Sequence, residues 1–456
     1  MADAASSPKQ TVAVRPKFTP SMRSSSSYLS DHQQYRPRAP EAVHQATDKA
    51  GEERGSFKGI PCEEKPPRIV ESGVTHEFSH PNCTRGAGAS ERLVATLFYK
   101  AAGEAMASQN GALAAANMAP TRDMEAFPLE PPAPDAEQLD HLYGSFISPL
   151  CITSFLHLMS TFPQPREDSQ PHSSHRCLDS QDRPRVVELV LAPAPSTRYL
   201  TLGDLRRHEA IFRFEREWSV DVALQRDVVW RRHPRLVVFD MDSTLITQEV
   251  IELLADMATS PAGDLAARVA SITQRAMQGE IEFEASFRER VALLRGLDAS
   301  LFEDLRARLE VTPGARQLIA ALKRLGVKTA VVSGGFEPLT QWLAGELGLD
   351  HAFANRVAVA EGKLTGQTLG AIVGKERKRD LLLEIAAKEG IHLEQVVAIG
   401  DGANDLLMLD AAGLGVAWRA KPRVQMEADV RLNGESMLDL LYLFGFTSDE
   451  IDLLVE

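Results

Sequence analysis

The chain of 456 residues carries a formal net charge of −13, and 44% of its residues are hydrophobic. This size and composition allow two or three domains with buried cores, while the acidic balance argues against a general nucleic-acid binder. The four cysteines are scattered, which fits a reducing compartment better than a disulfide framework. The sequence contains no run of about 18 apolar residues, so no membrane span is predicted. The first residues lack the apolar core of a signal peptide, and their prolines and Asp3 argue against a mitochondrial presequence, so we expect a cytoplasmic protein.

Residues 1–90 are poor in aliphatic side chains and rich in Ser, Pro, Gly and charge. Such a composition buries too little apolar surface to fold, so we expect a disordered tail. Within it, His76, His80 and Cys83 have spacings that a metal could use. Because no fourth ligand follows at a zinc-like spacing, a solvated tail is the preferred interpretation.

Residues 91–230 alternate between strand-like and helix-like patterns and contain an Ala-, Gly- and Pro-rich insertion around 101–140. The expected elements run strand, helix, strand, helix, strand and are residues 92–100, 148–162, 185–193, 200–218 and 220–227. This order predicts a small α+β domain. It resembles a degenerate ACT-like domain, the amino-acid-sensing fold, although one strand of that fold has no counterpart in the pattern. The alternative is a spacer domain whose role is to form a homodimer.

From residue 235 to 445, apolar strands alternate with helices over short links, which predicts an α/β fold with a doubly wound parallel sheet. The expected strands are residues 236–240, 328–333, 396–401 and 414–418. The first three end in a polar residue: Asp240, Ser333 and Asp401. The reactive crevice of an open α/β sheet lies at the carboxyl ends of its strands. Three separate strands therefore direct polar groups to one place.

Asp240 and Asp242 are separated by one methionine, so in extended backbone both side chains project to the same side. One carboxylate could attack phosphorus and form an aspartyl-phosphate, while the other transfers the protons of the leaving group and of water. Taken alone, Asp-x-Asp is also typical of a turn or a helix cap. Its position directly after a buried strand favours the catalytic interpretation.

Asp401 and Asp405 follow the third strand in the sequence GDGANDLLML. Carboxylates gathered near Asp240 would repel one another without a cation, and Mg²⁺ takes oxygen ligands. Asp240 and Asp401 are therefore the expected side-chain ligands of Mg²⁺. A glycine turn followed by a capped helix would explain the local shape but not the excess of acids.

Two further segments offer groups that suit a phosphate. Ser333 and Gly334 follow the second strand with a hydroxyl and exposed backbone N–H groups, which alone is a weak signal. A helix beginning near residue 374 starts in a basic cluster, of which one cation should offset phosphate charge. Composition does not choose among its members, which are Lys375, Arg377, Lys378 and Arg379.

The ordered set DMDST, VVSGG, GKERKRD and GDGAND resembles the haloacid dehalogenase-like superfamily, and within it the phosphoserine phosphatase family, over about residues 235–445. The resemblance implies a Rossmann-like core in which Asp240 is the phosphorylated nucleophile and Asp242 the general acid/base. It implies Mg²⁺ ligation by Asp240, Asp401 and the backbone carbonyl of Asp242. The implied phosphate-binding residues are Ser333, Gly334, Lys378 and Asn404, with Asp405 orienting Lys378.

The same resemblance implies a small helical cap at about residues 250–310. It places the clamp for the substrate carboxylate at Arg290 and the contact to the substrate amino group at Glu249. The implied apolar lid contacts are Met277 and Phe283. Arg forms bidentate bonds with a carboxylate and Glu pairs with an ammonium, so the assignment fits an amino-acid substrate. Without the resemblance, Arg290 would be interpreted as one more solvated helix charge.

The implied activity is Mg²⁺-dependent hydrolysis of O-phosphoserine to serine and phosphate, the last step of serine biosynthesis. Three alternatives stay open: a phosphatase for another small phosphorylated metabolite, phosphotransfer to an acceptor other than water, and a catalytically idle amino-acid sensor. The N-terminal half departs from compact members of the family and is closer to fungal-type forms.

Overall fold

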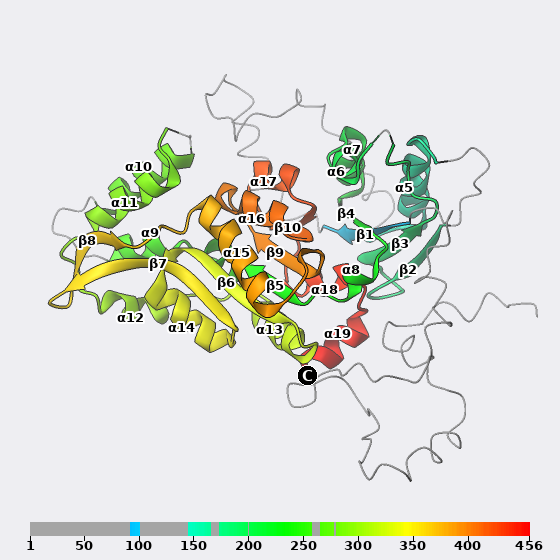
Figure 1. Cartoon of the computed structure of the whole chain (residues 1–456). Coiled ribbons are helices and arrows are strands. Elements are labelled where there is room, and N and C mark those ends of the chain that lie inside the picture. The colour runs from blue at the N-terminus through cyan, green and yellow to red at the C-terminus, as the bar shows by residue number, and fades with distance from the viewer. Residues whose placement is uncertain (1–91, 101–144, 166–172, 199, 258–264, 278–279) are drawn as a thin grey trace, which may run out of the picture. The chain divides into compact units, whose positions relative to one another are not determined.

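The structure, a computed structural model, describes residues 92–100, 145–165, 173–198, 200–257, 265–277 and 280–456. These residues belong to one compact unit and contain two sheets, each with its own helices (Figure 1). The tail predicted at residues 1–90 and the insertion predicted around 101–140 lie outside the described residues. Within the described part of the chain, no helix combines the length and the apolar character that crossing a membrane requires.

The N-terminal domain is built on a four-stranded antiparallel sheet in the order β2-β3-β1-β4. Its elements are β1 (Leu93–Tyr99), α5 (Pro149–Thr161), β2 (Ser174–Cys177), β3 (Val186–Leu191), α6 (Leu202–Arg206), α7 (Glu209–Trp218) and β4 (Val220–Arg226). The order βαββαβ is the ferredoxin-like arrangement. Helices α5 and α7 contact each other and share one apolar core with the strands. The ACT-like character of this domain remains a prediction.

Two features of the N-terminal domain differ from the expected elements. Strand β2 was not expected, because its sequence Ser-His-Arg-Cys has no apolar residue run and it lies exposed at the edge of the sheet. The helix expected over 200–218 is two helices, separated at Arg207 and His208. The Nδ1 atom of His208 accepts a hydrogen bond of 3.2 Å from the backbone N–H of Ala210, which caps α7. Both differences arise from polar residues at element boundaries.

The C-terminal domain is built on a seven-stranded sheet in the order β11-β10-β9-β5-β6-β7-β8. The strands are β5 (Leu236–Phe239), β6 (Lys328–Phe336), β7 (His351–Ala360), β8 (Lys363–Leu369), β9 (Val396–Gly400), β10 (Leu414–Trp418) and β11 (Val430–Leu432). All pair in parallel except β8, which is antiparallel to β7. The α/β fold with a mostly parallel sheet is thus confirmed, while β7, β8 and β11 were not expected from the pattern.

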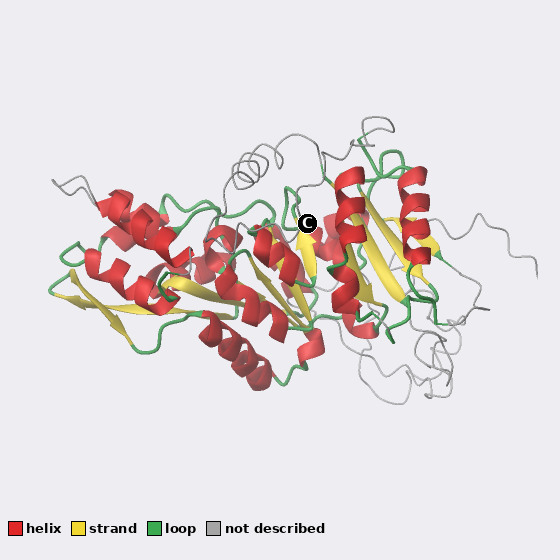
Figure 2. Ribbon diagram, turned by 90° about the horizontal axis from the view of Figure 1, so that it is seen from above, coloured by secondary structure: helices red, strands yellow, loops and turns green. Residues whose placement is uncertain are grey.

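Helices cover both faces of this sheet (Figure 2). They are α9 (Val250–Met257), α10 (Leu265–Met277), α11 (Phe283–Leu293), α12 (Leu301–Arg306), α13 (Ala315–Arg324), α14 (Glu337–Leu347), α15 (Lys375–Glu389), α16 (Leu406–Ala411), α17 (Pro422–Glu427), α18 (Asp439–Leu443) and α19 (Ser448–Val455). Short turns lie at η3 (Met241–Leu245), η4 (Leu393–Gln395) and η5 (Ala403–Asp405). Apolar residues of α15, α16 and α17 share a core with β5, β6 and β9. Helices α13 and α14 contact β6.

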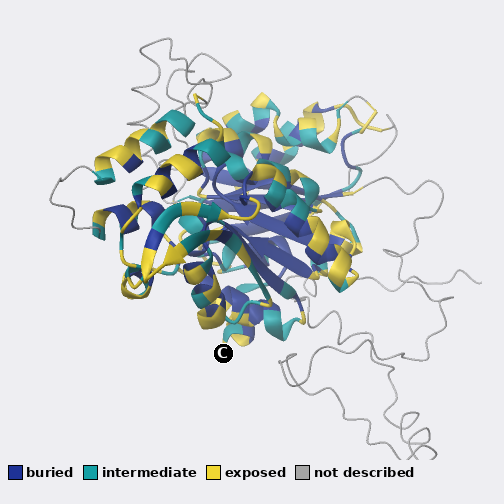
Figure 3. Ribbon diagram, turned by 60° about the vertical axis from the view of Figure 1, so that its left-hand side comes forward, coloured by how far each residue is buried: buried dark blue, intermediate teal, exposed yellow. Residues whose placement is uncertain are grey.

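Strand β5 is the first strand of the C-terminal sheet in the sequence and lies near its centre, between β9 and β6. All four of its residues are buried, as the dark central strands in Figure 3 show. The chain proceeds from β5 to β6 on one side and to β9 and β10 on the other. This is the topological switch point at which open α/β sheets form their crevice, at the carboxyl ends of the strands. Helices α9 to α12 are inserted between β5 and β6, beside this crevice.

A buried charge cluster centred on Glu188 lies between the two domains. Glu188 of β3 is 2% exposed and forms ion pairs with Arg176 of β2 and with Arg231 of α8 (Val229–Arg232), the helix that links the domains. Arg176 also donates a hydrogen bond of 2.8 Å to the carbonyl of Gly445, beyond α18. Burial raises the pKa of Glu188, but the attraction of Arg231 and Arg176 outweighs it and lowers that pKa to about 2.

We predict that Glu188→Gln lowers the free energy of unfolding at pH 7 by about 3–5 kcal/mol, because it leaves Arg231 buried without a counterion. The folded-state pKa lies below the unfolded one, so this stabilisation is complete above about pH 4.5 and declines toward pH 2. Urea unfolding at pH 7 and pH 3 measures both effects. Glu217→Gln removes an exposed i,i+4 pair and should change stability by less than about 0.5 kcal/mol. Equal losses in the two variants would contradict the prediction.

Candidate active site

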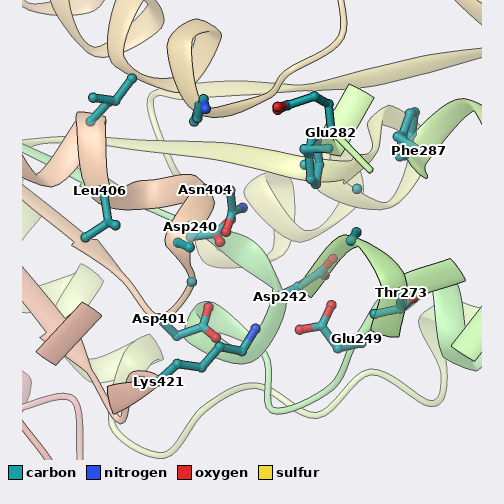
Figure 4. Close-up of a pocket in the computed structure, with 18 of the residues that line it drawn as sticks. Asp240, Asp242, Glu249, Thr273, Glu282, Phe287, Asp401, Asn404, Leu406 and Lys421 are labelled. Carbon is teal, nitrogen blue, oxygen red and sulfur yellow. The ribbon is translucent and has the colours of Figure 1, made fainter. Parts of the chain in front are cut away.

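A cavity of about 620 Å³ lies at the carboxyl ends of β5, β6 and β9, beneath the helices inserted after β5 (Figure 4). Eight of the twelve residues expected at the site line it: Asp240, Asp242, Glu249, Phe283, Arg290, Gly334, Asp401 and Asn404. Three more are fully buried: Ser333, Lys378 and Asp405. The side chain of the twelfth, Met277, is outside the described set, although its backbone ends α10.

The backbone after β5 presents both acids of the Asp-x-Asp pair to the cavity. Asp240 and Asp242 have extended backbone conformations, with ψ values of 165° and 137°. Met241 between them is fully buried, as alternation predicts. Ser243 then adopts the left-handed region at φ 54°, which turns the chain sharply toward the cap. With this strained turn directly after them, the two carboxylates lie side by side at the carboxyl end of β5.

Lys378 holds the base of the site together. Its Nζ atom lies 2.7 Å from Oδ1 of Asp240 and 2.7 Å from Oδ1 of Asp405, and its side chain is wholly buried. Burial lowers the pKa of Lys378, but the attraction of the two carboxylates outweighs it and the net shift is upward, so the ammonium stays charged. Asp405 is itself fixed, since its Oδ2 accepts a hydrogen bond of 3.1 Å from the N–H of Gly402.

The basic cluster at the beginning of α15 divides as the family resemblance implied. Lys378 alone of the four candidates contacts Asp240 among the ion pairs of the described residues. Arg377 pairs with Glu384 instead, and Arg379 pairs with the adjacent Asp380. These two arginines therefore belong to the solvated face of the helix.

Three carboxylates gather where a metal ion could bind. One oxygen from each of Asp240, Asp401 and Asp405 lies within 4.8 Å of the others. Burial, followed by repulsion from Asp405, raises the pKa of Asp240 well above its usual value and that of Asp401 to about 7. An all-oxygen set of buried carboxylates that resist ionisation matches the preference of a hard divalent cation. Because both oxygens of Asp405 are engaged by Lys378 and Gly402, Asp240 and Asp401 are the better candidate ligands.

Asp242 has the environment of an acid that retains a proton. Its Oδ1 atom is buried without a hydrogen-bond partner. Burial first, and repulsion from Glu249 second, raise the pKa of Asp242 well above its usual value. A Cβ atom on Gly335 would lie 3.2 Å from Oδ2 of Asp242, so glycine there leaves room around the acid.

The irregular last part of β6, at residues 333–335, is fixed by a residue that the sequence did not single out. The N–H of Gly335 donates a hydrogen bond of 2.8 Å to Oγ of Ser333. Asn355 of β7, 2% exposed, donates to the carbonyl of Gly334 at 2.9 Å and accepts from the N–H of Val373 at 2.7 Å. Asn355 thus joins the end of β6 to the segment before α15. No signal in the sequence of β7 marks it, because the strand was not expected.

The cap contributes an arginine and an aromatic cluster. Arg290 of α11 is 8% exposed, its Nη1 lies 3.4 Å from Oγ1 of Thr273, and its Nε is buried without a partner. Glu249 accepts a hydrogen bond of 2.9 Å from Oγ of Ser243. Phe283 stacks on Phe287 with ring centroids 6.3 Å apart.

Phe283 also lines the cavity and lies against the last part of β6. Its Cζ atom would lie 3.0 Å from a Cβ on Gly334. A side chain at position 334 would therefore collide with the ring of Phe283. Phe287, which was not expected at the site, lines the same cavity, and the role of Phe283 as a lid contact remains a prediction.

Comparisons with known proteins agree with this geometry. A model of haloacid dehalogenase-like hydrolases matches residues 237–410. A probable phosphoserine phosphatase of Schizosaccharomyces pombe is 42% identical over 292 residues, which cover 61% of this chain and 96% of the relative. The chain belongs to the phosphoserine phosphatase family. A phosphoserine phosphatase of Streptomyces coelicolor is 50% identical over 234 residues, 51% of this chain but 56% of that relative's length.

Among solved structures, a hydrolase of the same superfamily from Salmonella enterica aligns with a TM-score of 0.54 and 25% identity. The alignment covers 77% of this chain and 98% of the other. The C-terminal domain is only about half of the chain, so the alignment extends beyond it.

A substitution at Gly400 tests the geometry of the site without a measurement of catalytic turnover. A Cβ at this position would lie 2.5 Å from Cγ and Oδ2 of Asp405, so Gly400→Ala must displace the carboxylate that holds Lys378. We predict a loss of about 1–3 kcal/mol in the free energy of unfolding, measured with urea. The control is Gly345→Ala in α14, where a Cβ meets nothing within 4 Å. It should stabilise the helix by about 0.5–1 kcal/mol. A Gly400→Ala variant as stable as the parent would refute this packing.

Proposed function

We propose that the protein hydrolyses O-phosphoserine to serine and phosphate with the help of Mg²⁺, the closing reaction of serine biosynthesis. Membership of the phosphoserine phosphatase family supports the reaction class. The observation that carries the proposal is that Asp240 and Asp242 line one cavity with Asp401 beside them, while the buried Lys378 pairs with Asp240 from below the cavity surface. Two acids and a buried cation at the switch point of the sheet suit attack on a phosphate ester.

The cap supports a small amino acid as the leaving group. The Nε of Arg290 is buried without a partner and the side chain faces the cavity, which suits the carboxylate of phosphoserine. Glu249 lines the same cavity and would pair with the substrate ammonium. Phe283 and Met277 would cover the apolar part of the substrate. The unsatisfied guanidinium is the feature that favours an amino acid over other small phosphate esters.

In the first displacement, a carboxylate oxygen of Asp240 attacks phosphorus and the bond from phosphorus to the serine oxygen breaks. Asp242 donates its proton to that oxygen, so serine leaves as a neutral alcohol. Ser333, Lys378 and Asn404 would hold the transferring phosphoryl group, together with the backbone N–H of Gly334. The product of this step is an aspartyl-phosphate on Asp240.

In the second displacement, the ionised Asp242 takes a proton from water as that water attacks phosphorus. The phosphorus–Asp240 bond breaks, phosphate leaves, and both acids return to their starting state. Hydrolysis of phosphate monoesters is very slow without a catalyst, so the site must lower the barrier by on the order of 20 kcal/mol. Lys378 orients Asp240, and the N–H of Met241 donates a hydrogen bond of 2.7 Å to Oδ1 of Asp240. This orientation of the nucleophile contributes to the lowering of the barrier.

Mg²⁺ would be held by Asp240, Asp401 and the backbone carbonyl of Asp242. The fit is supported by the raised pKa values of Asp240 and Asp401, which burial and neighbouring acids cause and a divalent cation would offset. When bound, the ion would neutralise charge on the phosphoryl oxygens and so let an anionic nucleophile approach an anionic ester. Lys378, paired with Asp240, would also offset phosphoryl charge.

The first test is phosphate release from O-phosphoserine by the full chain. We expect activity that EDTA abolishes and Mg²⁺ restores, and we expect Asp240→Asn to lower kcat by more than about 10⁴-fold because the nucleophile is lost. Asp304→Asn, an exposed acid on α12, should leave kcat unchanged. No Mg²⁺-dependent release would favour the idle-sensor alternative. Equal kcat for Asp240→Asn and the parent would exclude the aspartyl-phosphate route.

The second test addresses the substrate class. Arg290→Ala should lower kcat/KM for O-phosphoserine about 100-fold more than for O-phosphoethanolamine, which lacks the carboxylate. Arg288→Ala, an exposed residue on the same helix, is the control and should affect both substrates little. If Arg290→Ala leaves the ratio of the two kcat/KM values unchanged, Arg290 is not the carboxylate clamp. A panel of phosphorylated sugars and nucleotides then separates phosphoserine from other small metabolites.

A further inference from the structure

Helix α17 forms a wall of the cavity that no part of the mechanism has used. Lys421, immediately before the helix, and Arg423 and Glu427 within it all line the cavity. The backbone N–H of Lys421 donates a hydrogen bond of 3.1 Å to the carbonyl of Asp401. Figure 4 shows the Lys421 side chain extending between the carboxylates of Asp401 and Glu249. Lys421 therefore brings a cation to the centre of an acidic cavity.

The charges around the cavity indicate what the Lys421 ammonium does there. The acids facing the cavity include Asp240, Glu249 and Asp401, and their ionised forms would repel an incoming phosphate dianion. Lys378 is already shared between Asp240 and Asp405. The side chain of Lys421 lies beside the carboxylate of Asp401 and, within the described part of the chain, is not shared in this way (Figure 4). An added positive charge here makes the cavity more attractive to an anion.

The position of α17 is set by the N-terminal domain. Arg206 of α6 forms an ion pair with Asp429, two residues beyond α17, and its Nε donates to the carbonyl of Leu224 at 2.9 Å. Arg207 donates a hydrogen bond of 2.7 Å to the carbonyl of Glu427, the last residue of α17. Both arginines thus hold the C-terminal end of α17, the helix that Lys421 directly precedes.

A second, more buried connection reaches the same helix. Arg431 of β11 pairs with Glu215 of α7 at 2.7 Å, and both side chains are at most 7% exposed. Arg431 also donates to the carbonyl of Gln425 in α17 at 3.4 Å. Asn433 links the side chain of Gln425, at 3.1 Å, to Asp221 of β4, at 3.0 Å. The N-terminal domain therefore contacts α17 and its flanks through several fixed polar bonds.

We propose that Lys421 is an anion-attracting residue of the active site and that the N-terminal domain positions it by holding α17 through Arg206. The identity of the anion, the phosphate of O-phosphoserine, rests on the proposed function. The placement of Lys421 does not, because any phosphate in the cavity meets the same charge. Arg206 is a positioning residue that acts through Lys421.

The test measures binding of inorganic phosphate by calorimetry in the presence of Mg²⁺, which needs no turnover. Lys421→Met should weaken phosphate binding about tenfold and flatten its dependence on NaCl, because an attracting charge is lost. Lys421→Arg keeps the charge and should bind phosphate within about threefold of the parent. Unchanged phosphate affinity in Lys421→Met would overturn the proposal. A melting temperature equal to that of the parent establishes that the variant is folded.

The positioning role of Arg206 is tested by combining substitutions at Arg206 and Lys421 in a double-mutant cycle. Arg206→Gln should weaken phosphate binding about threefold in the parent but not in the Lys421→Met background, because both changes act on one group. Arg206→Lys keeps the ion pair with Asp429 and should restore affinity. Arg176→Gln removes an interdomain arginine that does not reach α17 and serves as the control for lost stability. Additive effects of Arg206→Gln and Lys421→Met, or equal losses of affinity in Arg176→Gln, would overturn the coupling.

These outcomes remain distinct from those of the proposed function. If phosphate binding depends on Lys421 while the parent releases no phosphate from O-phosphoserine, the proposed reaction fails and the inference stands. If the parent hydrolyses O-phosphoserine and Lys421→Met binds phosphate and turns over as the parent does, the reaction stands and the inference fails.

Discussion

The ammonium of Lys378, buried between Asp240 and Asp405, is the interaction on which the rest of the site depends. A lysine without water contact is stable there only because two carboxylates surround it, and the carboxylates tolerate their own burial only because the lysine is charged. The triad joins the residue directly after β5 to α15 and η5, which follow more than 130 residues later in the sequence. It therefore fixes the orientation of Asp240 before any substrate arrives.

The sheet topology explains why such a costly arrangement forms. Parallel strands end at one edge, and the switch point between β9 and β6 leaves β5 with space beyond its carboxyl end. At that edge, the irregular end of β6 carries Gly334, and the turn after β9 carries Gly402. Hydrophobic burial of the strands supplies the stabilisation that the crowded acids oppose. The repulsion that remains is what a divalent cation and a phosphate would relieve.

Much of this site could be predicted from the sequence, because each polar residue follows an apolar strand. Asp240, Ser333 and Asp401 were expected at one edge for that reason, and the structure places them there. The choice of Lys378 over its basic neighbours needed the family resemblance, since helix composition treats all four alike. Lys421 follows β10 by the same edge rule and could have been identified.

The remaining differences arise where function or fold depends on distant contacts. Asn355 was not predicted, because its role lies in bridging Gly334 and Val373 across the fold rather than in a local motif. Strand β2 was not predicted, because an exposed edge strand needs no apolar pattern. The single helix expected over 200–218 failed at His208, whose ring caps a new helix. The first case depends on a tertiary partner, the second on the position of β2 at the sheet edge, and the third on a local cap.

The ion pair of Arg431 with Glu215 has a consequence for separating the two domains. Cutting the chain at the linker near residue 234 and removing one half would leave each of these side chains without its partner. In a free-standing catalytic half, Arg431 and Asp429 would exchange their counterions for water, because Glu215 and Arg206 belong to the other half. That half would keep its charges but lose the bonds that join β11 and the end of α17 to a neighbouring domain.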